Sequence, residues 1–222
     1  MIEAGGELGR IHRLFRDIDS PLAATTPGWR LRFDLDAKLA EIEGYLSLIG
    51  SRASLDAFES ATIPLLRRRD VLLAEVPRLL DELEEAKSQV LHGDYGLENL
   101  LFQREGALAA VVDFGPPQPF LVAYEIGRIA FPAEHFAQQD WVERGVALLA
   151  AYRDENPRAA DQIRFAPAAW LVQLIRSTYG LKQHYGDPVE FQADLDRFWL
   201  QRARGAEILF DMLPAVMKAL PQ

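Results

Sequence analysis

One short hairpin pattern constrains this chain more than any other feature, because the residues around it are patterned for helices. Asn99–Gln103 and Ala107–Val112 form two apolar, strand-like stretches, and Arg104-Glu105-Gly106 between them is a turn signal. Cross-strand neighbours in such a hairpin lie roughly 5 Å apart. The pattern therefore predicts that Asn99, at the open end of one strand, lies close to Asp113, which follows the other strand.

A third polar side chain, Asp94, lies five residues before Asn99 on the loop that enters the hairpin. An amide oxygen from Asn99 and a carboxylate from Asp113 are hard ligands of the kind that suits Mg²⁺ carrying substrate phosphates. Asp94 can reach the same place without being a metal ligand. This is the division of labour that phosphoryl transfer needs, with one carboxylate orienting the attacking hydroxyl and separate oxygens holding the metal.

The motif His92-Gly93-Asp94, with Asn99 after it and a hairpin that ends at Asp113, resembles the aminoglycoside phosphotransferase and choline-kinase-like superfamily. Gly93 stands where protein kinases usually carry arginine, and no Ala-Pro-Glu motif follows. Both features favour the small-molecule branch of the protein-kinase-like fold. The resemblance implies that Asp94 is the catalytic base, that Asn99 and Asp113 bind Mg²⁺, and that His92 supports the loop.

Two flanking segments extend the resemblance over most of the chain. Residues 8–12 resemble the helix that follows the interlobe hinge in this superfamily. Residues 123–128 resemble its Tyr-Asp-Leu-Ala segment, with Glu125 in place of the usual aspartate. The resemblance implies a structural role for Glu125 and a substrate-binding role for the helices that follow.

Helical periodicity covers most of the remaining sequence. We expect helices over residues 3–18, 35–50, 52–86, 121–131, 137–154, 158–184, 188–204 and 206–219, and a loop over residues 19–34. Pro64 and Pro77 leave open whether residues 52–86 form two helices or one kinked helix. Asn156-Pro157 and Asp187-Pro188 each place a capping residue before a proline, which predicts a helix start.

These expectations give a mostly helical α+β fold with one small β-hairpin. The resemblance implies that it is a protein-kinase-like C-terminal lobe in which this hairpin carries the catalytic loop. We expect one lobe over residues 1–222. Its parts are a helical segment (1–88), the catalytic loop and metal-binding hairpin (89–120), and a helical substrate-binding segment (121–222).

The strand-rich N-terminal lobe with which this superfamily binds ATP is predicted to be absent. Nothing before residue 89 is patterned as such a lobe, the glycine cluster at residues 4–9 leads into a helix, and Lys38 lies in a helical stretch. The sequence thus identifies no nucleotide-binding residue. Three explanations of this absence remain open. They are a mis-assigned start or split gene, a chain that is an excised piece, and a natural single-lobe protein. Since phosphoryl transfer depends on positioning and charge neutralisation, we expect little turnover from this chain alone.

Composition excludes several classes of protein. The net charge of -9 and the presence of only four lysines argue against a nucleic-acid partner. The absence of cysteine excludes disulfides, thiolate catalysis and cysteine-based zinc sites. No signal peptide and no apolar run of roughly 18 residues is visible, so we expect a cytoplasmic protein with no membrane partner.

Other residues with chemical potential have simpler interpretations. His12, His135 and His184 lack metal-ligand spacing, and Arg67-Arg68-Arg69 is interpreted as a solvated helix face. Core packing is favoured for the apolar stripe on the predicted helix 158–184, which consists of Trp170, Leu171, Leu174, Ile175 and Leu181. A place in a substrate pocket is the weaker alternative for three polar or aromatic residues of that helix, namely Arg176, Tyr179 and His184.

The leading functional hypothesis is an ATP- and Mg²⁺-dependent phosphotransferase that transfers the γ-phosphate to a hydroxyl of a small metabolite or antibiotic. The alternatives are a non-catalytic kinase-like binding module, or a truncated fragment that needs a separate N-lobe or partner chain. The acceptor stays open among aminoglycosides, homoserine, choline-like amines and sugar-like molecules, and so does the oligomeric state.

Overall fold

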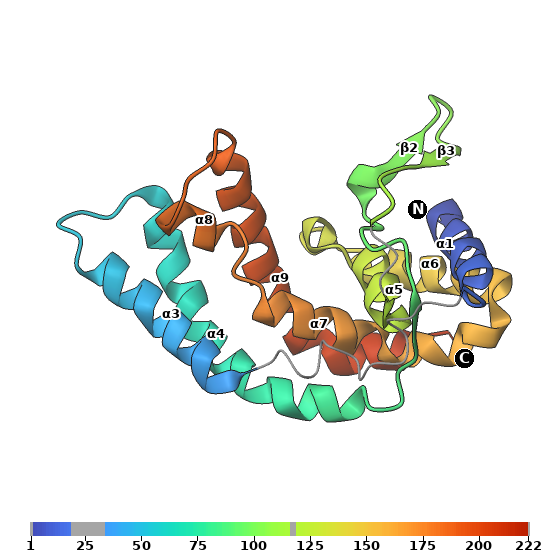
Figure 1. Ribbon diagram of the computed structural model, residues 1–222, viewed down its shortest axis with the longest axis horizontal. Coiled ribbons are helices and arrows are strands. Elements are labelled where there is room, and N and C mark those ends of the chain that lie inside the picture. Colours follow the sequence, from blue (N-terminus) through green and yellow to red (C-terminus); the bar gives the residue numbers. More distant parts are fainter. Residues whose placement is uncertain (1, 19–33, 116–118, 222) are drawn as a thin grey trace.

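The computed structural model describes residues 2–18, 34–115 and 119–221 and has the expected mostly helical architecture (Figure 1). The predicted loop at 19–34 lies outside the described residues apart from its last residue. The α-helices are α1 (Ile2–Phe15), α3 (Leu35–Gly50), α4 (Ala57–Glu82), α5 (Val122–Ala130), α6 (Trp141–Glu155), α7 (Ala166–Arg176), α8 (Leu181–Tyr185) and α9 (Gln192–Ala219). The strands are β1 (Ser88–Val90), β2 (Leu100–Phe102), β3 (Leu108–Val111) and β4 (Pro119–Leu121). Among the described residues, none before Ser88 lies in a strand.

The predicted hairpin is confirmed. β2 and β3 pair antiparallel with Leu100 opposite Val111, and the turn between them contains Gly106 at a φ of +89°. That angle is easy for glycine, which has no Cβ. The hairpin projects from the helical body (Figure 1).

A second small sheet was not predicted from the sequence. β1 pairs antiparallel with β4, with Gln89 opposite Phe120. In sequence, the His92-Gly93-Asp94 motif and the hairpin lie between these two strands, so their pairing closes the base of the whole segment. Each strand has three residues, which is too short for a periodicity signal.

The helix predicted over residues 158–184 is wrong as a single element. A 3₁₀ helix covers Pro157–Phe165, α7 follows, the chain is extended at Ser177, and α8 begins after Gly180. Gly180 has a φ of +92°, and a Cβ there would lie 2.5 Å from the carbonyl oxygen of Leu195. The left-handed backbone at Gly180 cannot belong to an α-helix, which explains the break.

The two helices predicted at 188–204 and 206–219 are instead the single helix α9. It passes through Gly205, where the ring of Phe136 packs so closely that a Cβ would lie 2.9 Å from it. Tertiary packing therefore overrides the weak helix propensity of glycine. Asp187-Pro188 does not start this helix, because α9 begins at Gln192.

The helix predicted at 52–86 is one helix, α4, which contains both Pro64 and Pro77 and changes direction along its length in Figure 1. It begins at residue 57, because Asp56 and Glu59 form a reciprocal capping box. The solvated face predicted for Arg67-Arg68-Arg69 is wrong for Arg69. That side chain is buried and donates to the carbonyl oxygens of Leu174 and Ile175 at the end of α7.

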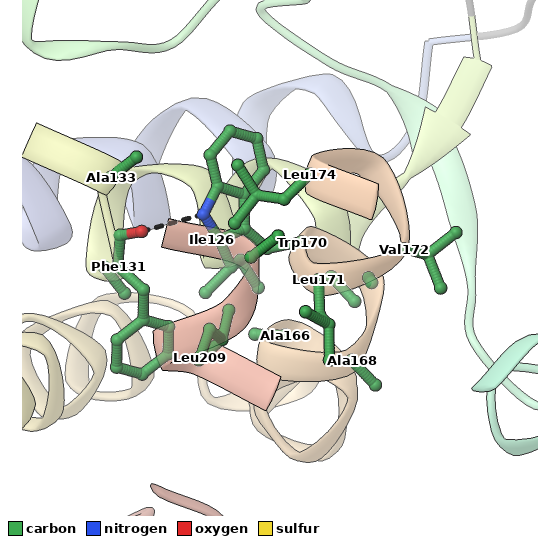
Figure 2. Close-up of a cluster of buried hydrophobic side chains, with 14 of the residues drawn as sticks. Ile126, Phe131, Ala133, Ala166, Ala168, Trp170, Leu171, Val172, Leu174 and Leu209 are labelled. Carbon is green, nitrogen blue, oxygen red and sulfur yellow. Dashed lines mark hydrogen bonds between the residues drawn. The ribbon is translucent and has the colours of Figure 1, made fainter. Parts of the chain in front are cut away.

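The core runs between α5, α7 and α9, with α1 packed on α6 and α4 along α7 (Figure 1). Figure 2 shows Trp170 of α7 beside Ile126 of α5 and Leu209 of α9, with its indole N–H donating to the carbonyl oxygen of Phe131 at 2.7 Å. Burial of each large apolar side chain contributes about 1.5–3 kcal/mol. The apolar stripe of α7 is therefore core, as its spacing predicted. In the part of the chain that the structure describes, no helix has the length and hydropathy to cross a bilayer.

Candidate active site

The carboxylate of Glu125 on α5 accepts hydrogen bonds from the loop that carries Asp94. The backbone N–H of His92 donates to Glu125 Oε2 at 3.1 Å, and that of Gly93 donates to Oε1 at 2.7 Å. Glu125 is fully buried, and Gly93 has a φ of +91° that turns the loop. Glutamate therefore fills a structural role here despite standing where the superfamily usually has aspartate.

A chain of buried polar groups continues from Glu125 to α1 and α6. His12 Nε2 lies 2.9 Å from Glu125 Oε2, and His12 Nδ1 lies 2.9 Å from the hydroxyl oxygen of Tyr152. Burial raises the pKa of the Tyr152 hydroxyl, so it stays protonated and can donate to His12. The Nδ2 group of Asn156 donates to that hydroxyl in turn at 3.3 Å. His12 is thus a core residue, and this network fixes the loop relative to two helices.

His92 braces the loop and the hairpin together. Its Nε2 lies 3.0 Å from the carbonyl oxygen of Val112, and its Nδ1 accepts from the backbone N–H of Asp94 at 3.3 Å. This pairing requires a neutral imidazole with its proton on Nε2. The ring also packs on Phe114, with centroids 4.2 Å apart. Both ring nitrogens are occupied, which leaves His92 no free group for proton transfer.

The side chain of Asp94 is fixed by two partners. The Nδ2 group of Asn99 donates to the Asp94 carbonyl oxygen at 2.9 Å and to Asp94 Oδ2 at 3.0 Å. Arg128 of α5 donates to Asp94 Oδ1 at 2.5 Å and also to Glu98 at 2.8 Å. Burial disfavours the charged form of the Arg128 guanidinium and lowers its pKa. The electrostatic interactions with Tyr124, Asp94 and Glu98 favour the charged form more strongly, so the pKa of Arg128 lies above its ordinary value.

Asp113 lies where the hairpin meets the loop. The N–H of Val112 donates to the carbonyl oxygen of Asn99 at 3.0 Å, and that of Gly115 donates to the carbonyl oxygen of His92 at 2.8 Å. Asp113 lies between these two cross-links with an exposed side chain and a φ of +59°. Among the described residues it is the only non-glycine in the left-handed region. Aspartate tolerates that region better than most residues.

The donor set fits Mg²⁺ as a minimal site. The amide nitrogen of Asn99 donates to Asp94, which turns Asn99 Oδ1 to the opposite side of the amide group. Asp113 adds one exposed carboxylate. Mg²⁺ commonly uses one or two carboxylates and takes its other ligands from phosphates and water. Nowhere in the described ranges do three or more His, Cys, Asp or Glu side chains gather into a metal site.

The start of α1 contacts both the loop and the hairpin. The hydroxyl of Tyr95 donates to the carbonyl oxygen of Ala4 at 2.7 Å, and the backbone N–H of Leu108 donates to Glu3 at 2.6 Å. The first helix therefore positions residues that lie about 90 to 105 positions later in the sequence.

Two cavities flank the loop. One of about 230 Å³ is lined by Glu98, Arg128 and residues of α7 and α9. The other, of about 340 Å³, is lined by Gly93, Gly115 and Tyr124 among others. A larger cavity of about 690 Å³ lies between α1, α6 and the hairpin strand β3.

Arg128 is the site residue for which sequence reasoning assigned no role. It falls within the segment 123–128 that carries the family resemblance, three residues after Glu125, so both face the loop from one side of α5. The residues for which a substrate pocket was the weaker alternative do not lie with Arg128. His184 bonds to Asp196, and none of Arg176, Tyr179 and His184 is among the lining residues described for the cavity beside Arg128.

Comparison with known proteins gives a matching family model and a similar solved structure. A family model described as the phosphotransferase enzyme family matches residues 2–165. An ethanolamine kinase of Plasmodium vivax has a similar fold, with a TM-score of 0.53 and 16% sequence identity over 90% of this chain. The match covers 58% of that kinase, so this chain spans less than two thirds of its length. No curated protein matches the chain.

Proposed function

Because the chain belongs to the phosphotransferase enzyme family, we propose that it transfers the γ-phosphate of ATP to a hydroxyl of a small molecule. The observation that carries this proposal is the bond between Asn99 Nδ2 and Asp94 Oδ2 at 3.0 Å. It joins the candidate base to a candidate metal ligand at the end of the hairpin.

In this proposal Asp94 accepts or orients the proton of the attacking hydroxyl. Its carboxylate is held by Arg128 on one oxygen and by Asn99 on the other, so its orientation is set before the acceptor arrives. Pre-set orientation is a main source of rate enhancement in phosphoryl transfer, because the protein does little covalent chemistry. His92 and Glu125 hold the loop in place without contacting the reacting atoms.

Asn99 and Asp113 would hold Mg²⁺ through one amide oxygen and one carboxylate. When bound, the ion would bridge and neutralise the phosphates. Asp113 has a φ of +59°, a backbone conformation that costs energy for a residue with a Cβ, and this cost supports a role for the carboxylate beyond local structure.

We propose that residues 1–222 belong to one lobe, with segments 1–88, 89–120 and 121–222 in the roles expected from sequence. We expect turnover to require a strand-rich ATP-binding lobe, because phosphoryl transfer depends on holding the phosphates in place. Exposed apolar side chains on and after the hairpin, namely Leu101, Phe102 and Phe114, support a contact there.

Thermal unfolding with and without Mg-ATP tests nucleotide binding. Stabilisation is expected for the native chain and its loss is expected for Asp113→Asn, which removes the charge but keeps a side chain that tolerates positive φ. Glu105→Gln, at the far end of the same hairpin, is the matched control. No stabilisation by Mg-ATP would count against a nucleotide site.

Phosphoryl transfer is then followed with a panel of hydroxyl acceptors, comparing the native chain with Asp94→Asn. Transfer that depends on Asp94 supports the enzyme. Nucleotide binding without transfer, even in the presence of an added ATP-binding lobe, supports the binding-module alternative.

A further inference from the structure

The cavity of about 230 Å³ adjoins the candidate base through Arg128, which lines it and also donates to Asp94. Its walls come from the loop after Asp94, from α5, from α7 and from α9. A molecule in this cavity would therefore lie beside the arginine that holds Asp94.

An arginine of α9 lies on the aromatic wall of this cavity. The guanidinium carbon of Arg202 is 4.7 Å from the ring centroid of Trp170 and 4.9 Å from that of Phe198. Trp170 is itself fixed in the core by its hydrogen bond to Phe131 (Figure 2). The two rings thus hold the guanidinium in a set orientation by cation–π contact.

The acidic side chains around the cavity form no ion pair with Arg202 in the part of the chain that the structure describes. Arg128 is paired with Asp94 and Glu98, whereas Arg202 has no ion pair within the ranges that the structure describes. Within the same ranges, its Nε atom is buried and has no hydrogen-bond partner. Glu134, at the exposed rim, is the remaining acidic residue of the lining.

This arrangement discriminates between kinds of acceptor. The aromatic faces on which an ammonium group could bind are already covered by the protein's own cation. A guanidinium is a planar fork of N–H groups, which match the two oxygens of a carboxylate or phosphate.

We propose that Arg202 is a specificity-determining residue that binds an oxyanion, carboxylate or phosphate, on the acceptor of the phosphoryl group. The role as acceptor site rests on the proposed function. The binding of an oxyanion at Arg202 does not, and it can be measured without turnover.

The test uses ligand-observed NMR on the full chain with five probes of similar size. Glycerate and serine carry a carboxylate, glycerol 3-phosphate carries a phosphate, and glycerol and ethanolamine carry neither. The three probes that carry an oxyanion group are expected to bind about tenfold or more tightly than glycerol and ethanolamine, because a charge-assisted bond is lost without that group. Comparison of glycerate with glycerol 3-phosphate tells which oxyanion the site takes.

Arg202→Met is expected to remove this preference, and Arg202→Lys to retain only part of it, because an ammonium lacks the planar fork. Arg204→Met, on the exposed side of the same helix, is the control and should leave binding unchanged. Should Arg202→Met fail to fold, Arg202→Lys decides the question.

Three results would overturn the inference: no anion-dependent binding by the native chain, ethanolamine binding as well as glycerate, or the same affinities after substitution of Arg202. If anionic probes bind through Arg202 but no phosphate is transferred, the inference stands and the proposed function fails. If transfer occurs with an acceptor that has no oxyanion, the proposed function stands and the inference fails.

Discussion

His12 of the first helix and Glu125 of α5 lie 113 residues apart in sequence, yet the Nε2 atom of one is 2.9 Å from the Oε2 atom of the other in the core. The same carboxylate accepts the backbone N–H groups that begin the Asp94 loop. Loop geometry and core stability therefore depend on one side chain.

Glu125→Gln tests this dependence. An amide has one oxygen, so its NH₂ group would face a donor of the loop or of His12. Breaking a buried charged network typically costs about 3 kcal/mol, which lowers the melting temperature by about 2–4 °C per kcal/mol in a chain of this size. Circular dichroism melts measure the change, with exposed Glu143→Gln as control. Unchanged melting would show that the network contributes little.

Arg128→Met tests the positioning of Asp94. Without the guanidinium, only Asn99 restrains the carboxylate, and a displacement of about 1 Å at a catalytic group can cost about 10²-fold in rate. We expect a fall in kcat with little change in KM for ATP, since Arg128 contacts Asp94 and Glu98. A change confined to KM would place Arg128 in nucleotide binding instead. Arg153→Met, on the surface of α6, is the control variant.

Arg69→Met tests the buried guanidinium between α4 and α7. It would remove the donor of the carbonyl oxygens of Leu174 and Ile175 at the end of α7, where the last carbonyl groups of a helix have no intrahelical partner. Burial lowers the pKa of Arg69 to about 10, so the group is still charged at neutral pH and complements the helix dipole. We expect a loss of about 2 kcal/mol in urea unfolding. Exposed Arg67→Met on the same helix should cost less than about 0.5 kcal/mol.

The surroundings of Glu41 predict that the free energy of unfolding decreases at acidic pH. Burial raises its pKa, but hydrogen bonds from Lys38 and Thr178 outweigh burial, so the pKa lies below the ordinary 4.5. The native carboxylate thus binds a proton less tightly than the unfolded one. Its stabilising contribution is present above pH 4.5 and is lost as the pH falls through the lower native value.

Glu41→Gln should therefore be less stable than the native chain at neutral pH, and the difference should shrink on going to about pH 3. Urea unfolding at both pH values measures it. Glu43→Gln, exposed on the same helix, should show no such convergence. A pH-independent difference would mean that the bonds of Glu41 do not require its charge.

Local chemistry explains what could be predicted from sequence. The hairpin follows from a glycine turn between two apolar stretches, and the contact between Asp94 and Asn99 follows from their spacing on one short loop. Capping at Asp56 is also local, although the predicted helix began at residue 52 and α4 begins at Ala57.

Contacts between distant segments explain the features that could not be predicted from the sequence. The pairing of β1 with β4 joins Gln89 to Phe120 and has no signal in either three-residue strand. Continuity of α9 through Gly205 depends on Phe136, and the burial of Arg69 depends on the end of α7. Gly180 did carry a local signal for the break after α7, but a long apolar periodicity outweighed it.

The loop hydrogen bonds to Glu125 have a consequence for solvent exchange. Amide protons in loops usually exchange quickly, because water reaches them without unfolding. Those of His92 and Gly93 are bound by a carboxylate that is itself sealed in the core. Their deuterium uptake should therefore be as slow as that of the central helices. The start of the loop that carries Asp94 would then be one of the most protected parts of the molecule.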